Sequence, residues 1–185
     1  MKVIGEKSIS SKLNSILMII FILITIILAV ALFYFLAMTT KIVDFKPHLS
    51  LEFGSMVFRF DKNIMPGTAL IFSVFSYDLI LLFIIYNLRR LFKSFSENDV
   101  FITKNVSRIR SIGVSVILMS FVWSIYSYSA AKKVVDVVSL SNHNITLDIV
   151  FKLNTTMIFC GIIILVFGEI FKIATKIAEE NELTI

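Results

Sequence analysis

The sequence predicts an all-α transmembrane fold, a four-helix membrane bundle with a small extracytoplasmic β-hairpin or sheet. The 185 residues are 57% hydrophobic and only 17% charged, whereas soluble domains carry about 25% charged residues. Two runs rich in β-branched residues predict the hairpin. Charged side chains are almost missing from four stretches, with Asp78 as the one exception: 13–40, 63–88, 111–131 and 153–168.

This composition argues against most soluble classes, because a soluble protein of this length needs charged helix faces to meet water. Soluble enzymes, nucleic-acid-binding proteins, secreted disulfide scaffolds and disordered chains are all disfavoured. The single cysteine, Cys160, leaves no disulfide or metal pair. No phosphate-binding glycine loop, zinc-ligand spacing or catalytic triad order is present in the sequence. We therefore expect one polytopic membrane domain over residues 1–185, with no enzymatic activity, catalytic residue, cofactor or metal.

The lengths of the four stretches predict four membrane spans, because about 20 apolar helical residues cross a hydrocarbon core about 30 Å thick. The spans are placed at about residues 13–38, 66–88, 111–131 and 153–174. Between them lie two outer loops and one cytoplasmic loop, at residues 41–65, 132–152 and 89–110.

Residues at the ends of the spans support these positions. The first span begins after Lys12, and Pro66 suits the first turn of the second. The second span stops at Arg89, the third before Lys132, and the fourth near Lys172. The bounds are uncertain by two to four residues, as is usual for helix ends read from sequence.

A cleavable signal peptide is the rival interpretation of the first span. Ala29-Val30-Ala31 has the small-x-small pattern of a cleavage site. The apolar run continues past Ala31 to Met38 and is too long for an ordinary signal peptide. This length favours an uncleaved signal anchor.

The orientation follows from the positive charges in the short loops. Eleven of the 18 Lys and Arg residues lie on the side that carries the N-terminus, the loop 89–110 and the C-terminus. This bias predicts that both termini are cytoplasmic. The net charge of +5 then reflects topology and contact with anionic lipid headgroups, and we expect no direct nucleic-acid partner.

The outer loops carry the β-hairpin signal. Residues 134–140 and 145–151 are rich in Val, Ile and Thr and flank a polar turn, which predicts a hairpin. Partial alternation of apolar and polar residues over 51–61 adds a strand to this sheet. The alternative is that spans three and four extend as helices beyond the bilayer.

Asp78 lies near the middle of the second span, where an ionised aspartate costs roughly 2.5–3.5 kcal/mol on insertion scales. The best predicted hydrogen-bond donors for it are Ser120, Ser124 and Ser127, which share one face of the third span. Two roles remain open for Asp78: polar contacts that hold two helices together, or a proton or ion relay.

The cytoplasmic side carries the densest polar detail. Asn105 and Arg108 lie near one face of a helix start, and Asn105 is expected to bond backbone groups of the loop. Glu169 pairs either with Lys172 or with middle-loop arginines such as Arg110. The acidic residues of the C-terminal tail, Glu179, Glu180 and Glu182, either fold back on these arginines or bind a basic partner.

Two segments carry a resemblance to a known family. They are Phe95-Ser96-Glu97-Asn98 with Phe101, Asn105-Val106, Arg108-Ile109-Arg110 and Ile112-Gly113, and Glu169-Ile170-Phe171-Lys172 with residues 179–185. In these segments and in its four spans, the chain resembles the YoaS-like family of bacterial four-span membrane proteins of unknown function. The resemblance implies a bacterial cytoplasmic (inner) membrane protein, often encoded beside a small helix-turn-helix regulator, with no established catalytic residue.

Three functions follow from these features. The favoured one is a non-enzymatic membrane component that contacts a cytoplasmic partner such as a small helix-turn-helix regulator. The alternative is a small transporter or channel subunit that uses Asp78, and four short spans would require a homo-oligomer to form a pore. A membrane enzyme comes last, because no convergent acid, base or metal groups are found.

Overall fold

A computed structural model describes residues 8–39, 50–53, 56–59, 68–141 and 149–182. Four long helices make up most of the described chain: α1 (Ile9–Thr39), α2 (Thr68–Ser96), α3 (Thr103–Ser141) and α4 (Thr155–Glu182). All four are long and apolar enough to cross a membrane. The chain is therefore a multi-pass membrane protein, and each predicted span overlaps one helix.

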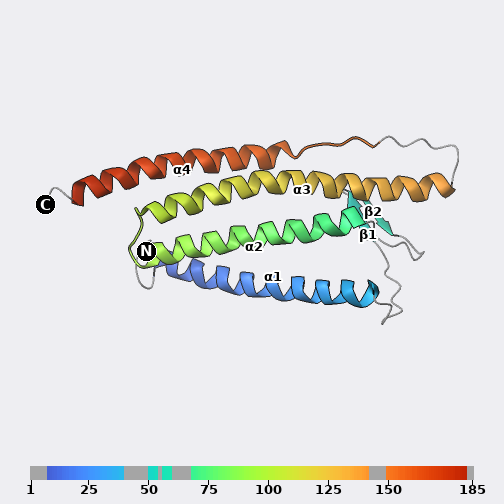
Figure 1. Ribbon diagram of the computed structural model, residues 1–185, viewed down its shortest axis with the longest axis horizontal. Helices are drawn as coiled ribbons and strands as arrows, with labels where there is room; N and C mark the ends of the chain where they lie inside the picture. The colour runs from blue at the N-terminus through green and yellow to red at the C-terminus, as the bar shows by residue number, and fades with distance from the viewer. Residues whose placement is uncertain (1–7, 40–49, 54–55, 60–67, 142–148, 183–185) are drawn as a thin grey trace.

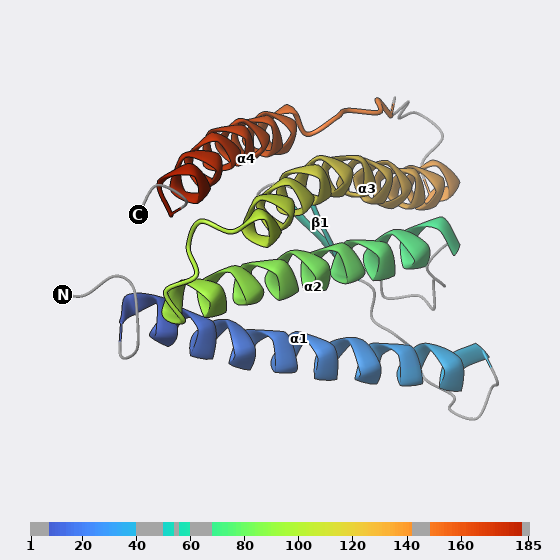
Figure 2. The same ribbon diagram turned by 60° about the vertical axis from the view of Figure 1, so that its left-hand side comes forward.

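The helices form an antiparallel bundle that is open rather than closed. In Figures 1 and 2, α1, α2, α3 and α4 lie side by side in a row, in sequence order. The extensive contacts between described elements join α1 to α2, α2 to α3, and α3 to α4. The described ends of the chain therefore lie at the same end of the molecule as the connection between α2 and α3.

Side-chain hydrogen bonds define where two of the helices begin. The backbone N–H of Ser11 donates to Ser8 Oγ at 3.4 Å, so Ser8 caps α1. The backbone N–H of Met157 donates to Asn154 Oδ1 at 3.2 Å, and Asn154 caps α4 in the same way. These caps satisfy N–H groups that have no partner within the helix.

The predicted β-hairpin over residues 134–151 is wrong, because α3 continues as a helix to Ser141. No glycine or proline interrupts the chain between Gly113 and this end, and valine costs a helix well under 1 kcal/mol per residue. Ala130 and Val134 are also buried. The predicted outer sheet that combines both loops is therefore wrong, because the second outer loop begins as an extension of α3.

Two four-residue strands are described in the segment between α1 and α2. They are β1 (Ser50–Phe53) and β2 (Met56–Arg59). They pair antiparallel with each other, with Ser50 opposite Arg59 and Phe53 opposite Met56. Residues 142–148, which hold most of the predicted turn and the first part of the predicted second strand, lie outside the described chain.

Glycines set the closest helix packing, between α3 and α4. A Cβ built on Gly161 would lie 2.5 Å from Ile117 Cγ1 and 2.9 Å from the carbonyl oxygen of Gly113. A Cβ on Gly113 would meet the Leu165 side chain at 2.9 Å. Only small residues at these positions let the two backbones approach so closely.

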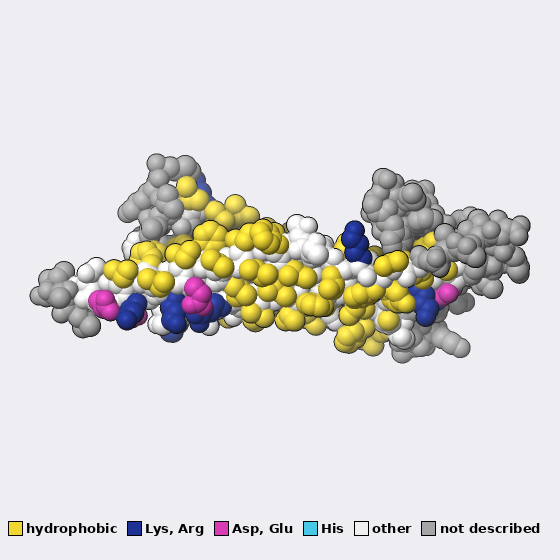
Figure 3. Space-filling view, turned by 90° about the horizontal axis from the view of Figure 1, so that it is seen from above, with side chains coloured by type: hydrophobic (Ala, Val, Ile, Leu, Met, Phe, Trp, Pro, Cys, Tyr) yellow, Lys and Arg dark blue, Asp and Glu magenta, His cyan; other side chains and the backbone are white. Residues whose placement is uncertain are grey.

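Charged groups gather toward the two ends of the molecule. Figure 3 shows Lys, Arg, Asp and Glu side chains near both ends, with a broad hydrophobic stretch between them. This distribution fits a helical bundle whose middle lies in hydrocarbon and whose ends meet polar headgroups.

Candidate functional site

The connection between α2 and α3 is the best-defined polar structure in the described chain. The helix α2 ends in a Schellman motif, in which Asn98 adopts a left-handed backbone conformation with φ of 69°. The N–H of Asp99 donates to the carbonyl of Ser94 at 3.0 Å, and the N–H of Asn98 donates to the carbonyl of Phe95 at 3.4 Å. Asparagine tolerates this conformation better than most residues, so the local sequence explains the sharp end of the helix.

Asn105 holds this connection from within. Its side chain is fully buried, and its Nδ2 group donates to the carbonyls of Asp99 and Val100, both at 2.9 Å. Nδ2 also lies 3.1 Å from Ser94 Oγ, and that hydroxyl donates to the Asp99 carbonyl at 2.7 Å. The prediction that Asn105 bonds backbone groups of the loop is confirmed.

Arg108 completes the network from the next turn of α3. Its Nη1 donates to Asn105 Oδ1 at 2.7 Å and to the carbonyl of Arg90 at 3.2 Å. The amide of Asn105 therefore uses both its donor and its acceptor. A buried polar network that satisfies its members holds a loop in one conformation, so the surface of this connection is preorganised.

Two contacts attach α4 to this end of the molecule. Arg110 Nη2 forms a salt bridge with Glu169 Oε1. The Phe171 ring stacks against Phe101 and Phe95, with centroids 5.4 and 6.2 Å away. Of the two partners predicted for Glu169, a middle-loop arginine is thus the one described.

The acidic residues further along α4 do not join this network. Glu180 pairs with Lys176 at 3.7 Å, four residues earlier on the same helix. Glu179 forms no described ion pair, and the side chain of Glu182 lies outside the description. The expectation that these acids pack beside Asn105 and Arg108 is not supported, because α4 continues beyond Glu169 away from the loop (Figure 1).

The exposed residues of the connection define what we call the middle-loop surface: Glu97, Asn98, Asp99 and Phe101. It presents two carboxylates beside an aromatic ring. No group of three or more His, Cys, Asp or Glu residues in the described chain is arranged to hold a metal ion. The arrangement is suited to binding another molecule through charge and aromatic contact.

A family model with the description "Protein of unknown function (DUF2975)" matches residues 55–185. The chain belongs to this family. The match covers the middle-loop surface and the helices α2, α3 and α4, whereas α1 precedes it. Membership in the DUF2975 family agrees with the expected uncharacterised family, while the narrower YoaS-like name stays a prediction. No curated protein and no solved structure matches the chain.

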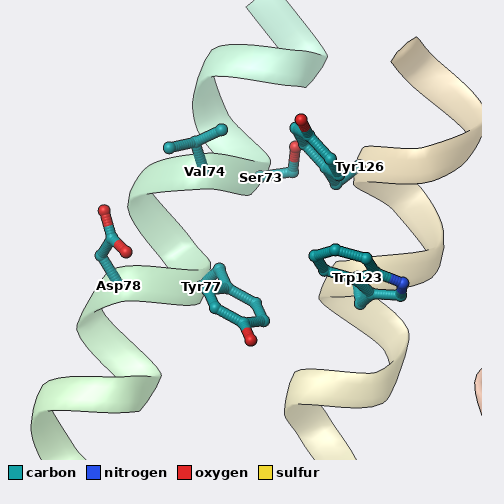
Figure 4. Close-up of a pocket in the computed structure, with 6 residues that line it drawn as sticks. All are labelled: Ser73, Val74, Tyr77, Asp78, Trp123 and Tyr126. Carbon is teal, nitrogen blue, oxygen red and sulfur yellow. The ribbon is translucent and has the colours of Figure 1, made fainter. Parts of the chain in front are cut away.

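Within the segment shared with the DUF2975 family, Asp78 lines a cavity of about 220 Å³ between α2 and α3. The other lining residues are Ser73, Val74, Tyr77, Trp123 and Tyr126. Figure 4 shows Tyr77 turned toward Trp123, while the Asp78 carboxyl points away from α3. The described residues provide no hydrogen-bond or salt-bridge partner for this carboxyl.

The predicted serine partners of Asp78 lie elsewhere. Ser120 and Ser124 are fully buried, but Ser120 Oγ donates to the carbonyl of Asn154 at 2.9 Å, next to the start of α4. Ser124 Oγ donates to the Ser120 carbonyl at 2.9 Å. The face they share meets α4 rather than α2, so this pairing is wrong. Whether any predicted site residue acts in function stays a prediction.

The roles of two site residues were not predicted from the sequence. Ser94 anchors the loop network through its hydroxyl, and Asn98 terminates α2. Asn98 had a usable signal, since asparagine after an apolar helical run is a common C-terminal cap. Ser94 had none, because a serine in a helix ordinarily bonds its own backbone.

Proposed function

We propose that this DUF2975 protein is a non-enzymatic component of a bacterial inner membrane that contacts a cytoplasmic partner through its middle-loop surface. The partner we expect is the small helix-turn-helix regulator that the YoaS-like resemblance implies. The buried Asn105 network carries the proposal, because its hydrogen bonds fix the shape of the connection and so preorganise its surface for binding.

The charge of the surface supports a basic partner. Glu97 and Asp99 are both exposed at the tip of the connection, and Glu97 lies 3.6 Å from Lys93. Glu179 and Glu180 are exposed toward the end of α4 at the same end of the molecule (Figure 1), and Glu180 pairs with Lys176. Complementary charge increases the rate of association and suppresses wrong partners. The proposal places this end in the cytoplasm, as the positive charges of the sequence predict.

Co-purification of the protein with a small helix-turn-helix regulator, of the kind that the YoaS-like resemblance implies, tests the proposal. Charge reversal by Glu97→Lys and Asp99→Lys is expected to abolish recovery of the regulator. The single reversal Asp136→Lys, at the opposite end of α3, is the control and should leave recovery unchanged. If the double variant recovers as much regulator as the original protein, the middle-loop surface is not the contact.

A transporter or channel that uses Asp78 remains the second candidate. It is favoured by an ionisable residue in a membrane span that borders a cavity and has no partner for its carboxyl among the described residues. Proton and ion flux into vesicles containing the purified protein tests this role. We expect a transporting protein to lose flux on Asp78→Asn. An absence of flux in both forms removes the candidate.

A further inference from the structure

A second polar feature lies at the same end of the molecule, on the outer face of α2. Tyr86, Arg89, Arg90 and Lys93 line a cavity of about 220 Å³. They belong to a helix whose preceding residues, 79–88, carry no charge. The cavity therefore lies where an apolar membrane span gives way to cations.

The two arginines of this cavity differ from the other arginines nearby in lacking acidic partners. Arg110 is paired with Glu169, and Arg108 is bonded within the loop network. Neither Arg89 nor Arg90 forms a salt bridge among the described residues.

Arg89 in particular has donors without good acceptors. Its Nη2 lies 3.5 Å from Met18 Sδ on α1, and a thioether is only a weak acceptor. Its Nε is buried and has no hydrogen-bond partner. A guanidinium that is held by packing and has unused donors is suited to an oxyanion such as phosphate, which accepts bidentate bonds.

The neighbouring side chains favour a lipid as the source of that oxyanion. Leu79, Phe83, Tyr86 and Arg90 follow one another at spacings of three and four residues, so they lie on one face of α2. All four are exposed in the row of helices. The Arg90 guanidinium also lies 5.4 Å from the centroid of the Tyr86 ring. An apolar strip that leads to an interfacial tyrosine and then to cations matches a lipid chain below its headgroup.

We propose that Tyr86, Arg89, Arg90 and Lys93 bind the phosphate of an anionic phospholipid, whose acyl chain lies along Phe83 and Leu79. Arg89 and Arg90 supply the main contacts. Lys93 is partly engaged by Glu97 at 3.6 Å and adds a third positive charge. This site adjoins the proposed partner contact, since Lys93 pairs with Glu97, but Tyr86, Arg89 and Arg90 lie earlier on α2 than the tip of the loop.

Lipid binding to the purified full-length protein tests the site. Native mass spectrometry in detergent would compare phosphatidylglycerol, phosphatidylcholine and inorganic phosphate as probes. We expect the original protein to retain phosphatidylglycerol in preference to phosphatidylcholine. The double variant Arg89→Gln and Arg90→Gln is expected to lose about tenfold or more in affinity for phosphatidylglycerol, because each basic residue near an anionic lipid adds to binding.

The double variant Lys132→Gln and Lys133→Gln is the matched control. It also removes two positive charges, but from the part of α3 that lies toward the opposite end of the molecule. It should keep the preference for phosphatidylglycerol. Equal losses in the two double variants would show general electrostatic attraction and would overturn the site. The single variant Arg90→Lys, which keeps the charge, is expected to fold and to weaken binding only partly.

The remaining arms distinguish the source of the phosphate. Phe83→Ser should weaken phosphatidylglycerol binding if the acyl chain lies along α2. If inorganic phosphate binds as well as the lipid and displaces it, the site takes a free anion and the lipid assignment is wrong. Binding of an acidic peptide with no effect of either lipid would likewise overturn it.

Discussion

Asn105 is the residue on which the shape of the middle-loop surface most depends. Its replacement by alanine takes the side-chain donor away from the Val100 carbonyl and leaves the Asp99 carbonyl with Ser94 Oγ alone. It also removes an acceptor of Arg108. An unsatisfied buried polar group costs about 1–3 kcal/mol. We expect Asn105→Ala to lower the thermal unfolding temperature in detergent and to expose residues 97–102 to protease.

Ser107→Ala is the control for this variant, because Ser107 is exposed two residues further along the same helix. It should change neither measurement. If the Asn105→Ala protein has the same unfolding temperature and the same protease resistance as the original protein, the network does not hold the loop.

Asp78 has a different environment, and its replacement distinguishes its two candidate roles. Without a described partner, the carboxyl contributes no helix-to-helix bond, while aspartate is costly within a membrane helix, by roughly 2.5–3.5 kcal/mol. We therefore expect Asp78→Asn to leave the thermal unfolding temperature unchanged or to raise it. A clear decrease would identify Asp78 as a structural contact between helices.

At the scale of elements, the packing of α3 against α4 depends on Gly161. A methyl group at this position would meet Ile117 and the backbone of Gly113, and overpacking of this kind costs about 1–3 kcal/mol. We expect Gly161→Ala to lower the unfolding temperature. Cys160→Ala is the matched control, since Cys160 is exposed and its replacement should be neutral. Equal stability of the two variants would mean that the helices do not approach so closely.

The extent of the helices shows what the sequence could predict. The four spans were predictable, because a long apolar stretch almost without charged residues defines a membrane span regardless of which helices pack against it. The end of α3 was not, because valines after Lys133 fit a strand and a helix almost equally well by local preference. Ala130 and Val134 are buried, and tertiary packing of this kind decides between the two.

The partners of particular side chains were predictable only where chain geometry left little choice. Helical spacing shows that Ser120 and Ser124 share a face, but it does not show which helix that face meets. In an open row, α3 has α2 on one side and α4 on the other, so the serines bond near Asn154 rather than Asp78. The salt bridge between Arg110 and Glu169 was easier to predict, because both residues lie where their helices reach the same end of the molecule.

At the scale of the whole molecule, the open row gives every helix a large lipid-facing surface. Among the described elements, α1 makes extensive contacts with α2 only. Many of the apolar side chains of α1 are exposed. The family match also begins after α1. The loop network and the Asp78 cavity lie between α2 and α3, and the proposed lipid site lies on α2, so all three involve the middle of the row.

The orientation of this row in the membrane yields the last prediction. The start of α1 and the end of α4 lie at the same end as the middle loop (Figure 1), and most of the described Lys and Arg residues lie toward that end. Because positive loops stay in the cytoplasm, we expect a cysteine introduced by Glu97→Cys in a Cys160→Ser background to resist a membrane-impermeant maleimide in intact cells. A cysteine introduced by Asp136→Cys, at the other end of α3, should be labelled. Both should react once the cells are opened, and the reverse pattern in intact cells would place the middle-loop surface and the lipid site outside.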